Sequence, residues 1–257
     1  MPDSLTVYLT GASAGIGAAT ARALAARGAR LILAARSVDR LRQLADELAD
    51  TETLVVELDV TDPEANLAVI DGLPEAWKVI DVAILNAGLA KALVPVWENT
   101  VADVDAMVDT NIKGVVNGIR AVVPGMLERG RGHVVLLGST ASHTVYPGGV
   151  VYCASKHAVR ALGDGLKVDL HGTPIRVSTV SPGIVETEFS LVRFDGDADR
   201  ADAVYADTHA LTAEDVADAI AYCVHAPAHV NVQELLLTPR VQSGYTMIAR
   251  GEAAEGL

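Results

Sequence analysis

The chain is poor in cysteine and in aromatic residues. Cys153 and Cys223 are the only cysteines among 257 residues, and Phe, Trp and Tyr together make up 4%. Two cysteines are too few for a disulfide framework and do not cluster as metal ligands do, so we expect both to be small buried residues. Because aromatics are scarce, aliphatic side chains have to form the core.

Basic residues are also scarce. The chain has 20 Lys and Arg residues against 33 Asp and Glu residues, which gives a formal net charge of −13. This charge repels the phosphates of nucleic acids and the surface of anionic membranes, so we expect neither as a partner. An anionic ligand would therefore need a local cluster of hydrogen-bond donors.

Long hydrophobic runs and targeting segments are not found either. No run of about 18 or more consecutive apolar residues occurs, and the segment Met1-Pro2-Asp3-Ser4-Leu5 lacks the features of a signal peptide. We therefore expect a cytoplasmic protein. With 50% hydrophobic and 21% charged residues, the composition is that of an ordinary globular protein, and the length allows one large α/β domain or two small ones.

Short aliphatic runs alternate along the chain with longer helical patterns. The predicted buried strands are 5–9, 30–34, 54–58, 80–85, 133–137, 175–180 and 234–237. Amphipathic helices are predicted over 15–27, 38–49 and 150–170, and Thr212 with Asp215 resembles a capping box that opens another helix toward Cys223. This alternation predicts an α/β fold of the Rossmann type. It would be a single domain over 1–257, with a doubly wound parallel sheet of about seven strands and helices on both faces.

Two stretches interrupt the alternation. They are 138–149, after the fifth predicted strand, and 181–208, after the sixth. Because ligands of open α/β sheets bind beyond the carboxyl ends of the strands, both stretches are predicted to be walls of an active site. We assign a substrate loop to about 181–211 and a C-terminal tail to about 240–257.

A glycine-rich turn directly follows the first predicted strand. Its sequence is Thr10-Gly11-Ala12-Ser13-Ala14-Gly15-Ile16-Gly17. Three glycines allow a tight turn, a close approach of the backbone to a diphosphate, and a helix N-terminus that favours anions. An ordinary glycine turn is the alternative, and the G-x-x-x-G-x-G spacing differs from the G-x-G-x-x-G of most dinucleotide folds. The position between strand and helix favours a dinucleotide site.

The end of the second predicted strand distinguishes the two nicotinamide dinucleotides. An acidic residue there would bind the ribose hydroxyls and repel a 2′-phosphate, whereas this chain has Arg36 and Ser37. The planar fork of Arg36 can pair with a phosphate, and Ser37 and Ser13 are further donors. We therefore expect NADP(H) rather than NAD(H). The alternative is that Arg36 is a solvated residue that opens a helix.

Tyr152 and Lys156 are four residues apart in a predicted helix and therefore share one face. A nearby cation favours the phenolate and lowers the tyrosine pKa from its usual value of roughly 10. Such a tyrosine can exchange protons with an alcohol or a ketone. Taken alone, this spacing more often belongs to a solvated helix face.

Taken together, these features resemble the short-chain dehydrogenase/reductase family, and the resemblance covers nearly the whole chain. Five motifs match in order: residues 10–17; Asn86-Ala87-Gly88; Asn111 in Asn111-Ile112-Lys113-Gly114; Ser139 with Tyr152 thirteen positions later and then Lys156; and Ser181-Pro182-Gly183-Ile184-Val185-Glu186-Thr187. One departure is Leu85, where the family usually has a second Asn. We expect it to affect strand packing more than chemistry.

The resemblance implies four catalytic residues, which are Asn111, Ser139, Tyr152 and Lys156. Tyr152 would be the general acid in reduction or the base in oxidation, and Ser139 would hydrogen bond to the reacting oxygen. Lys156 would lower the pKa of Tyr152 and bind the nicotinamide ribose. Asn111 would hold a water that links Lys156 to solvent. Read separately, Asn111 could instead form a helix or turn, Ser139 could be a loop hydroxyl, and Thr187 could cap a helix.

The resemblance also implies the residues that bind the dinucleotide. They are Thr10, Gly11, Ser13, Gly15, Ile16, Gly17, Arg36, Ser37, Asp59, Val60, Asn86, Ala87, Gly88, Tyr152, Lys156, Pro182, Gly183, Val185 and Thr187. Asp59 and Val60 would contact the adenine, 86–88 the adenosine ribose, and 182–187 the nicotinamide. The hydride chemistry would belong to the cofactor, while the protein supplies orientation and the proton. No metal is expected.

Within the family, the chain is most similar to the NADP-dependent 3-hydroxy acid dehydrogenases, a branch that includes serine 3-dehydrogenase and malonic semialdehyde reductase. This similarity is carried by 136–142, 169–173, 188–194 and 227–232. Small substrates of this branch carry a carboxylate, for which Arg193 is the candidate partner, while Ser139 and Tyr152 would face the reacting oxygen. The alternative is that Arg193 is solvated. We assign His143 to a polar pocket or to the surface.

Other functions stay open. A different small-carbonyl or aldehyde reductase of the same family is the nearest rival, because substrate loops vary on a common fold. A 3-oxoacyl carrier-protein reductase would need a basic docking surface, and Arg129 with Arg131 offers only a small patch. A non-catalytic NADPH-binding redox sensor is disfavoured by the intact Tyr152, Lys156 and Ser139.

The resemblance also bears on assembly. It implies a homo-oligomer, with a tetramer favoured, formed through two long helices near 100–127 and 150–170. The tail would close over a neighbouring subunit or over the pocket.

Overall fold

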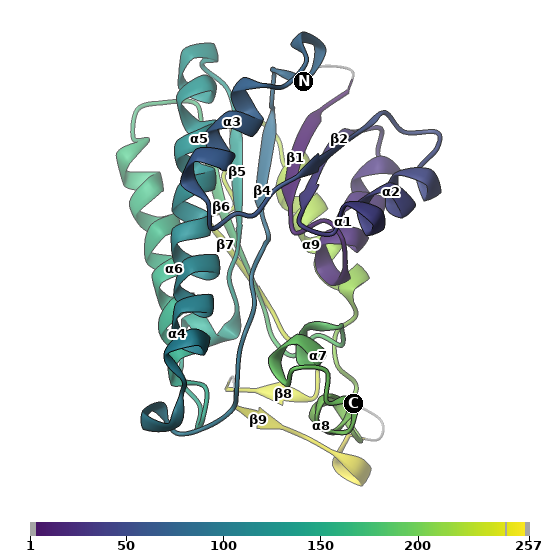
Figure 1. Ribbon diagram of the computed structural model, residues 1–257, viewed down its shortest axis with the longest axis vertical. Coiled ribbons are helices and arrows are strands. Elements are labelled where there is room, and N and C mark those ends of the chain that lie inside the picture. Colours follow the sequence, from purple (N-terminus) through teal and green to yellow (C-terminus); the bar gives the residue numbers. More distant parts are fainter. Residues whose placement is uncertain (1–3, 245, 255–257) are drawn as a thin grey trace.

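The computed structural model describes residues 4–244 and 246–254. Its centre is a seven-stranded parallel sheet with the order β3-β2-β1-β4-β5-β6-β7 (Figure 1). The strands are β1 (Thr6–Thr10), β2 (Arg30–Ala35), β3 (Thr53–Glu57), β4 (Val82–Leu85), β5 (His133–Leu137), β6 (Arg176–Pro182) and β7 (Glu234–Leu237). The strand order reverses at β1, which pairs with both β2 and β4. Ligands of such sheets bind beyond the strand ends at this reversal.

Helices cover both faces of the sheet (Figure 1). One face packs against α1 (Gly15–Ala25), α2 (Val38–Glu47) and α9 (Ala213–His225), and the other against α3 (Pro63–Asp71), α5 (Gly114–Arg129) and α6 (Val150–Asp169). The predicted single-domain, doubly wound α/β fold is confirmed. No helix of the described residues is long and apolar enough to cross a membrane.

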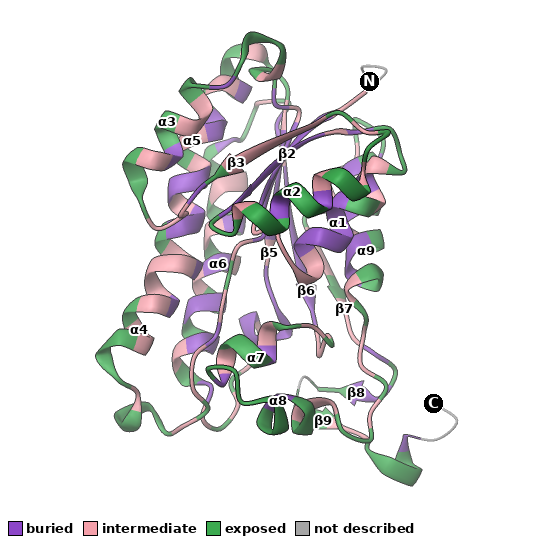
Figure 2. Cartoon of the chain, turned by 45° about the vertical axis from the view of Figure 1, so that its right-hand side comes forward, coloured by how far each residue is buried: buried purple, intermediate pink, exposed green. Residues whose placement is uncertain are grey.

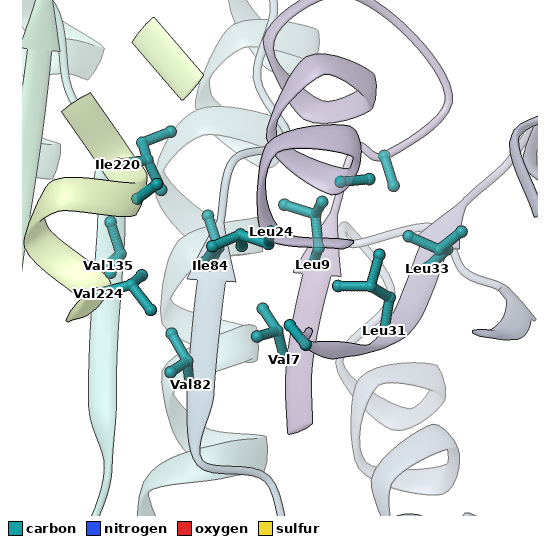
Figure 3. Close-up of a cluster of buried hydrophobic side chains, with 14 of the residues drawn as sticks. Val7, Leu9, Leu24, Leu31, Leu33, Val82, Ile84, Val135, Ile220 and Val224 are labelled. Atoms are coloured by element: carbon teal, nitrogen blue, oxygen red, sulfur yellow. The ribbon is translucent and has the colours of Figure 1, made fainter. Parts of the chain in front are cut away.

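The core is aliphatic and lies in two layers, one on each side of the sheet. In β1, Val7 and Leu9 pack in the layer beneath α1 and α9, while Tyr8 between them packs in the opposite layer. Figure 3 shows the first layer, with Leu24 of α1 and Ile220 of α9 pointing toward the strands. Because both faces are covered, the central strands are buried along their length (Figure 2). Their sequences are therefore apolar throughout, which is why they could be predicted.

All seven predicted strands are present, with ends that differ by at most two residues from the prediction. The predicted capping box is confirmed as well. The Thr212 amide donates to Asp215 Oδ2 at 2.8 Å, and the Asp215 amide donates to Thr212 Oγ1 at 3.2 Å, at the start of α9. The long helix predicted near 100–127 consists of α4 (Val101–Val108), a π-helical turn η3 (Asp109–Lys113) and α5. This π turn contains Asn111.

Several elements were not predicted. Helix α3 begins where Asp62 Oδ1 accepts the amides of Glu64 and Ala65 at 2.9 Å each. The predicted loop 181–208 contains two short helices, α7 (Phe189–Arg193) and α8 (Ala198–Tyr205). The remaining elements are the helical turns η1 (Glu75–Trp77), η2 (Val96–Glu98), η4 (Thr140–Ser142) and η5 (Gly251–Ala253), and the hairpin β8 (Gln242–Ser243) with β9 (Met247–Ile248).

The described part of the C-terminal tail folds back on its own chain. Arg250 Nη2 donates to the carbonyl oxygen of Val204 in α8 at 2.9 Å, and the Gly251 amide donates to that of Asp207 at 2.9 Å. The tail therefore supports the segment that follows β6.

Candidate active site

A cavity of about 380 Å³ lies at the carboxyl ends of the strands, where the strand order reverses. Its walls come from the β1–α1 turn, the ends of β2 and β3, the loops after β4 and β5, helix α6, and the segment after β6. Most of the predicted dinucleotide-binding residues line it: Gly11, Ser13, Gly15, Ile16, Gly17, Arg36, Ser37, Asp59, Val60, Asn86, Ala87, Gly88, Tyr152, Lys156, Pro182, Val185 and Thr187. The sequence motifs therefore meet at one place.

The β1–α1 turn has room only for glycine at two positions. Gly11 has a φ of +65°, and a Cβ on Gly17 would lie 2.1 Å from the Gly11 carbonyl oxygen. Asn86 Nδ2 holds the turn by donating to the carbonyl oxygens of Thr10 at 3.0 Å and Gly11 at 3.1 Å. No side chain caps Ala14, so the first amides of α1 are free to bind a ligand. This cradle fits the diphosphate of a dinucleotide.

Two predicted cofactor residues support the wall from behind and do not line the cavity. Thr10 is buried, and its hydroxyl accepts the amides of Asn86 at 3.1 Å and Ala87 at 3.2 Å. Gly183 donates its amide to the Leu237 carbonyl oxygen at 2.8 Å, which joins the end of β6 to β7. Their role is to join neighbouring strands.

Asp59 and Arg36 lie at the end of the cavity predicted for the adenosine. Burial acts to raise the pKa of Asp59, but hydrogen bonds from Thr61 and the charge of Arg36 outweigh it and hold that pKa below its ordinary value. The Thr61 amide and hydroxyl donate to Asp59 Oδ1 at 2.9 Å and 2.8 Å. The carboxylate is therefore fixed and ionised near neutral pH.

Arg40 lines the same end of the cavity, and the sequence prediction missed it. Its Nη1 lies 2.6 Å from Glu188 Oε2, so that this ion pair joins α2 to the segment after β6. The signal was present in the sequence, because Arg40 follows Arg36 by four residues and an α-helix brings such residues together. Two arginines beside Ser37 fit a 2′-phosphate.

Ser139, Tyr152 and Lys156 all line the opposite end of the cavity. Ser139 caps the helical turn η4, where its hydroxyl accepts the Ala141 amide at 3.1 Å. Tyr152 lies in the first turn of α6, and the Ser139 hydroxyl is close enough to its phenol to lower the Tyr152 pKa. The structure therefore places the predicted proton donor beside the hydroxyl predicted to orient the reacting oxygen.

The structure corrects the predicted effect of Lys156 on Tyr152. Burial raises the pKa of Tyr152 well above its ordinary value and Tyr146 raises it further, while Ser139 and the positive charge of Arg193 lower it only in part. Lys156 Nζ lies 6.0 Å from the Tyr152 ring centroid and donates to the Leu137 carbonyl oxygen at 2.8 Å. The four-residue spacing predicted correctly that Tyr152 and Lys156 share one face of the helix. It could not predict that the lysine side chain points toward the Leu137 carbonyl oxygen. Tyr152 is therefore a neutral phenol at physiological pH.

Burial also affects Lys156 itself. It disfavours the charged ammonium and lowers the pKa of Lys156 to about 8. This residue can therefore gain and lose a proton close to physiological pH, which an exposed lysine cannot do.

Asn111 lies behind the cavity wall, in the π turn η3. Its Nδ2 donates to the Leu89 carbonyl oxygen at 2.8 Å and to Ser155 Oγ at 2.9 Å, and its Oδ1 accepts the Leu89 amide at 2.8 Å. These bonds fix the loop after β4 against α6. A Cβ on Gly88 would lie 3.3 Å from Asn111 Oδ1 and 3.5 Å from Lys156 Nζ, so both residues are at the same depth of the site. The predicted water beside Asn111 stays a prediction.

Arg193 lies behind Tyr152 and does not line the cavity, although its neighbour Val192 does. Its guanidinium carbon is 5.4 Å from the Tyr152 ring centroid, and its Nη2 donates to Tyr146 Oη at 2.6 Å. Its Nε donates to the Ala92 carbonyl oxygen at 3.3 Å. The sequence prediction missed Tyr146, and the one signal for it was its position in the predicted wall 138–149.

Two smaller predictions can be compared with the structure. Cys153 and Cys223 are buried free thiols, as expected. Arg129 and Arg131 do not form a free basic patch, because they donate to the Ile80 carbonyl oxygen at 3.0 Å and to Asp81 Oδ1 at 3.2 Å. Within the described residues, no group of three or more His, Cys, Asp or Glu could hold a metal ion.

The fold and the site together define a class of protein. A doubly wound sheet with a dinucleotide cradle at one end of its cavity and a Ser-Tyr-Lys group at the other is the arrangement of a nicotinamide-dependent oxidoreductase. A family model for short chain dehydrogenases matches residues 5–196. The chain belongs to this family, and it is an oxidoreductase.

Comparison with known proteins identifies similar relatives. The chain is 44% identical over 240 residues to the NADP-dependent 3-hydroxy acid dehydrogenase of Salmonella typhi, covering 93% of this chain and 96% of the relative. It is 47% identical over 239 residues to sulfoacetaldehyde reductase 2 of Chromohalobacter salexigens, covering 92% and 95%. The closed form of a serine dehydrogenase complexed with NADP+ superposes with a TM-score of 0.91 at 43% identity, covering 93% and 96%.

Proposed function

We propose that the protein is an NADP(H)-dependent oxidoreductase that interconverts a small hydroxy acid and its oxo form. Serine, allo-threonine and 3-hydroxypropionate represent the substrate class. One observation carries this proposal: the neighbouring residues Ser139 and Tyr152 lie at one end of a cavity whose other end has Arg36 and Arg40. The relatives named as a 3-hydroxy acid dehydrogenase and a serine dehydrogenase support the same class.

In this mechanism the protein moves the proton, and the bound cofactor supplies the hydride. Ser139 hydrogen bonds to the substrate carbonyl oxygen and holds it beside the phenol. Tyr152 then donates its proton to that oxygen, and the raised pKa of Tyr152 ensures that the phenol carries this proton. Oxidation is the reverse: Tyr152 acts as the base once it has lost its proton, a form that its burial disfavours.

Lys156 and Asn111 serve the same proton path. Lys156 would bind the hydroxyls of the nicotinamide ribose, and its pKa of about 8 allows it to return a proton toward Tyr152. Asn111 holds the water through which Lys156 exchanges protons with solvent. This arrangement is supported by the position of both side chains, because Asn111 Oδ1 and Lys156 Nζ both lie close to Gly88.

Arg193 and Tyr146 provide recognition of the acid end of the substrate. Arg193 forms no ion pair with any residue in the part of the chain that the structure describes, and two of its donors rest on the neutral oxygens of Ala92 and Tyr146. A substrate carboxylate is a stronger partner than either, because a charged acceptor makes a stronger hydrogen bond. The expected contact therefore requires the guanidinium to turn from these partners toward the cavity.

A second candidate function is the reduction of a small sulfonated aldehyde. It is favoured by the relative named sulfoacetaldehyde reductase 2, which is 47% identical to this chain. A sulfonate is an anion that Arg193 can bind in place of a carboxylate. A reductase of a neutral carbonyl would gain nothing from this arginine.

A substrate panel tests the proposal. Malonic semialdehyde and sulfoacetaldehyde with NADPH, and serine, allo-threonine and 3-hydroxypropionate with NADP+, should be compared with neutral aldehydes and ketones. We expect the acids to have the highest kcat/KM. Equal turnover of neutral and acidic substrates would contradict the substrate class, and tight NADPH binding without any turnover would indicate a redox sensor instead.

Tyr152→Phe tests the mechanism. Removing an acid/base group should lower kcat by about 10² to 10⁴ while NADPH binding is retained. Tyr222→Phe is a matched control, because Tyr222 is exposed on α9 and far from the cavity walls. Activity of Tyr152→Phe within a few fold of the wild type would contradict the mechanism.

We further propose that the protein is a cytoplasmic homotetramer. Helices α4, α5 and α6 expose apolar side chains, among them Val101 (77% exposed), Leu127 (45%) and Val168 (72%). Such faces are typical of subunit interfaces, and two buried free cysteines suit a reducing compartment. Light scattering after gel filtration should give four times the chain mass, and Val168→Asp should lower it. Cell fractionation tests the location.

A further inference from the structure

One carboxylate outside the cavity joins three elements of the site. Glu234 begins β7 at the edge of the sheet. Its Oε1 lies 2.6 Å from His143 Nε2 and accepts the Ser181 hydroxyl at 3.1 Å. Its Oε2 lies 3.5 Å from Arg160 Nε. These four residues are the Glu234 cluster.

The His143 contact fixes the loop that holds the catalytic serine. Ser139 and His143 are the two caps of the short helical turn η4, and the His143 amide donates to the Thr140 carbonyl oxygen at 3.0 Å. The Ser139 amide in turn donates to Ser142 Oγ at 3.2 Å. Because the turn is internally bonded at both ends, a constraint on the His143 ring is passed to Ser139.

The other two contacts reach strand β6, through the hydrogen bond from Ser181, and more weakly helix α6, through Arg160. Arg160 follows Tyr152 and Lys156 on α6 at intervals of four residues, so the three share one face of that helix. Ser181 is fully buried in β6 and directly precedes Pro182, which lines the cavity. A single carboxylate therefore connects three elements. They are the turn η4, which carries Ser139, the helix α6, which carries Tyr152, and the end of β6, which forms part of the predicted nicotinamide wall.

The cluster is more enclosed than an ordinary surface ion pair. The His143 side chain is 14% exposed and that of Glu234 is 26% exposed. A carboxylate removed from water to this extent is held by its partners, and a charge-assisted hydrogen bond as short as that to His143 is directional. The longer contact with the half-exposed Arg160 resembles a surface pair, which contributes little. His143 and Ser181 are therefore the partners that matter most.

We propose that Glu234 is a positioning residue that sets the placement of Ser139 relative to Tyr152. It acts chiefly through His143 and Ser181, with Arg160 as a weaker link to α6, and it does not touch the substrate or the cofactor. The inference rests on the proposed roles of Ser139 and Tyr152, because proton transfer between fixed groups is sensitive to displacements of 1 Å or less. No sequence motif points to Glu234, and His143 is predicted only as a polar pocket or surface residue.

Three variants separate positioning from simple stabilisation. Glu234→Leu should lower kcat about tenfold, since a misplacement of about 1 Å costs up to about 10²-fold, and should leave KM for NADPH within about twofold. Glu234→Gln should recover most of the lost kcat, because its amide oxygen still accepts from His143 and Ser181. Gln233→Leu is the matched control: Gln233 donates to Asp164 Oδ1 of α6 at 3.1 Å without contacting the cluster, so kcat should not change.

A double-variant cycle tests the route through His143. His143→Ala alone should also lower kcat, and adding it to Glu234→Leu should lower kcat no further than the larger single effect. Independent, additive losses would overturn the route. If Glu234→Leu does not fold, His143→Ala and Glu234→Gln carry the test.

Tyr152→Phe, assayed in parallel, separates the two proposals. If Tyr152→Phe loses activity while Glu234→Leu keeps the wild-type kcat, the positioning role is wrong and the mechanism stands. If Tyr152→Phe stays active, the mechanism itself is wrong. Crystal structures give a readout that needs no turnover: in Glu234→Leu the loop 139–143 should move away from α6, and an unchanged loop would overturn the inference.

Discussion

The two ends of the active-site cavity are constructed differently. The diphosphate part of the cofactor end is made from backbone, with the Gly11 to Gly17 turn held by the amide group of Asn86. Behind the substrate end, side chains from separate segments hold one another, because Arg193 of α7 bonds to Tyr146 and Lys91 pairs with Asp195. A backbone cradle tolerates few sequences, whereas side-chain contacts can be exchanged one at a time. The first end therefore identifies the cofactor class, and the second allows relatives with different substrate names on one fold.

The largest effect should come from adding a methyl group to the backbone end. In Gly17→Ala the new Cβ would lie 2.1 Å from the Gly11 carbonyl oxygen and 2.7 Å from Asn86 Nδ2. Relieving such a clash costs about 3 kcal/mol, which corresponds to an NADPH affinity about 100-fold weaker if the turn moves. Titration of NADPH fluorescence measures it. Gly165→Ala, in α6 with open space around it, is the control and should bind NADPH normally.

A change at the side-chain end should affect the substrate alone. Arg193→Met should raise KM for a 3-hydroxy acid by about 10- to 100-fold, the value of a hydrogen bond to a charged group, without changing KM for NADPH. Steady-state kinetics with both ligands varied measures this. Arg200→Met is the control, since Arg200 stacks on Phe194 at 4.3 Å in the same segment. An unchanged KM for the acid would rule out the Arg193 contact.

The effect on the preference for NADPH over NADH should be smaller than these two effects. This preference should depend on the arginines of the cofactor end. Arg36→Ala should raise KM for NADPH by roughly tenfold, the value of one charge-assisted phosphate contact, and leave KM for NADH nearly unchanged. Arg40→Ala should have a weaker effect of the same kind. The exposed Arg27, which pairs with Asp218 at 3.0 Å away from this pocket, is the control. Equal effects on both cofactors would contradict the assignment to NADP(H).

A separate effect concerns stability rather than binding, at the junction of the two ends. Burial lowers the pKa of Lys156 to about 8 from 10.5, so between these values the unfolded chain binds more protons than the folded chain. Stability therefore rises with pH across this window, by up to about 1.4 kcal/mol per pH unit. Below the window, the full cost of burying the charged Lys156 ammonium reduces the stability of the folded chain. Lys156→Met should raise the unfolding temperature at pH 7 and raise it less at pH 10.

Thermal unfolding at the two pH values measures this difference. Lys167→Met on the same helix is the control, and it should change the unfolding temperature equally at the two pH values. A gain for Lys156→Met that does not depend on pH would show that the burial of the charge is not its cause.

The elements that could be predicted from the sequence are those that depend on a local sequence pattern or on full burial. Strands buried on both faces are apolar throughout, and the Thr212 capping box is a short-range motif, so both were found. Helices α7 and α8 were not, because contacts with distant residues such as Ala92 and Arg250 support them. Short helices of this kind have little stability of their own.

The same division holds for the candidate site. Each cofactor motif is a short contiguous stretch of the sequence, so each could be predicted from its own residues. The direction of Lys156 and the contact of Arg193 with Tyr146 depend on how side chains pack in three dimensions. The Glu234 cluster joins residues from 143 to 234, and no spacing along the chain indicates that they meet.

The position of β1 between β2 and β4 has a consequence for the order of folding. The pairing with β2 is local, but the pairing with β4 joins segments separated by about 75 residues, as does the bond from Asn86 to Thr10. Closing so long a loop is slow compared with forming a neighbouring pair. A nascent chain therefore cannot complete the glycine cradle until residue 86 has left the ribosome. Gain of NADPH binding would be a late event in refolding, and its rate would report when the two halves of the sheet join.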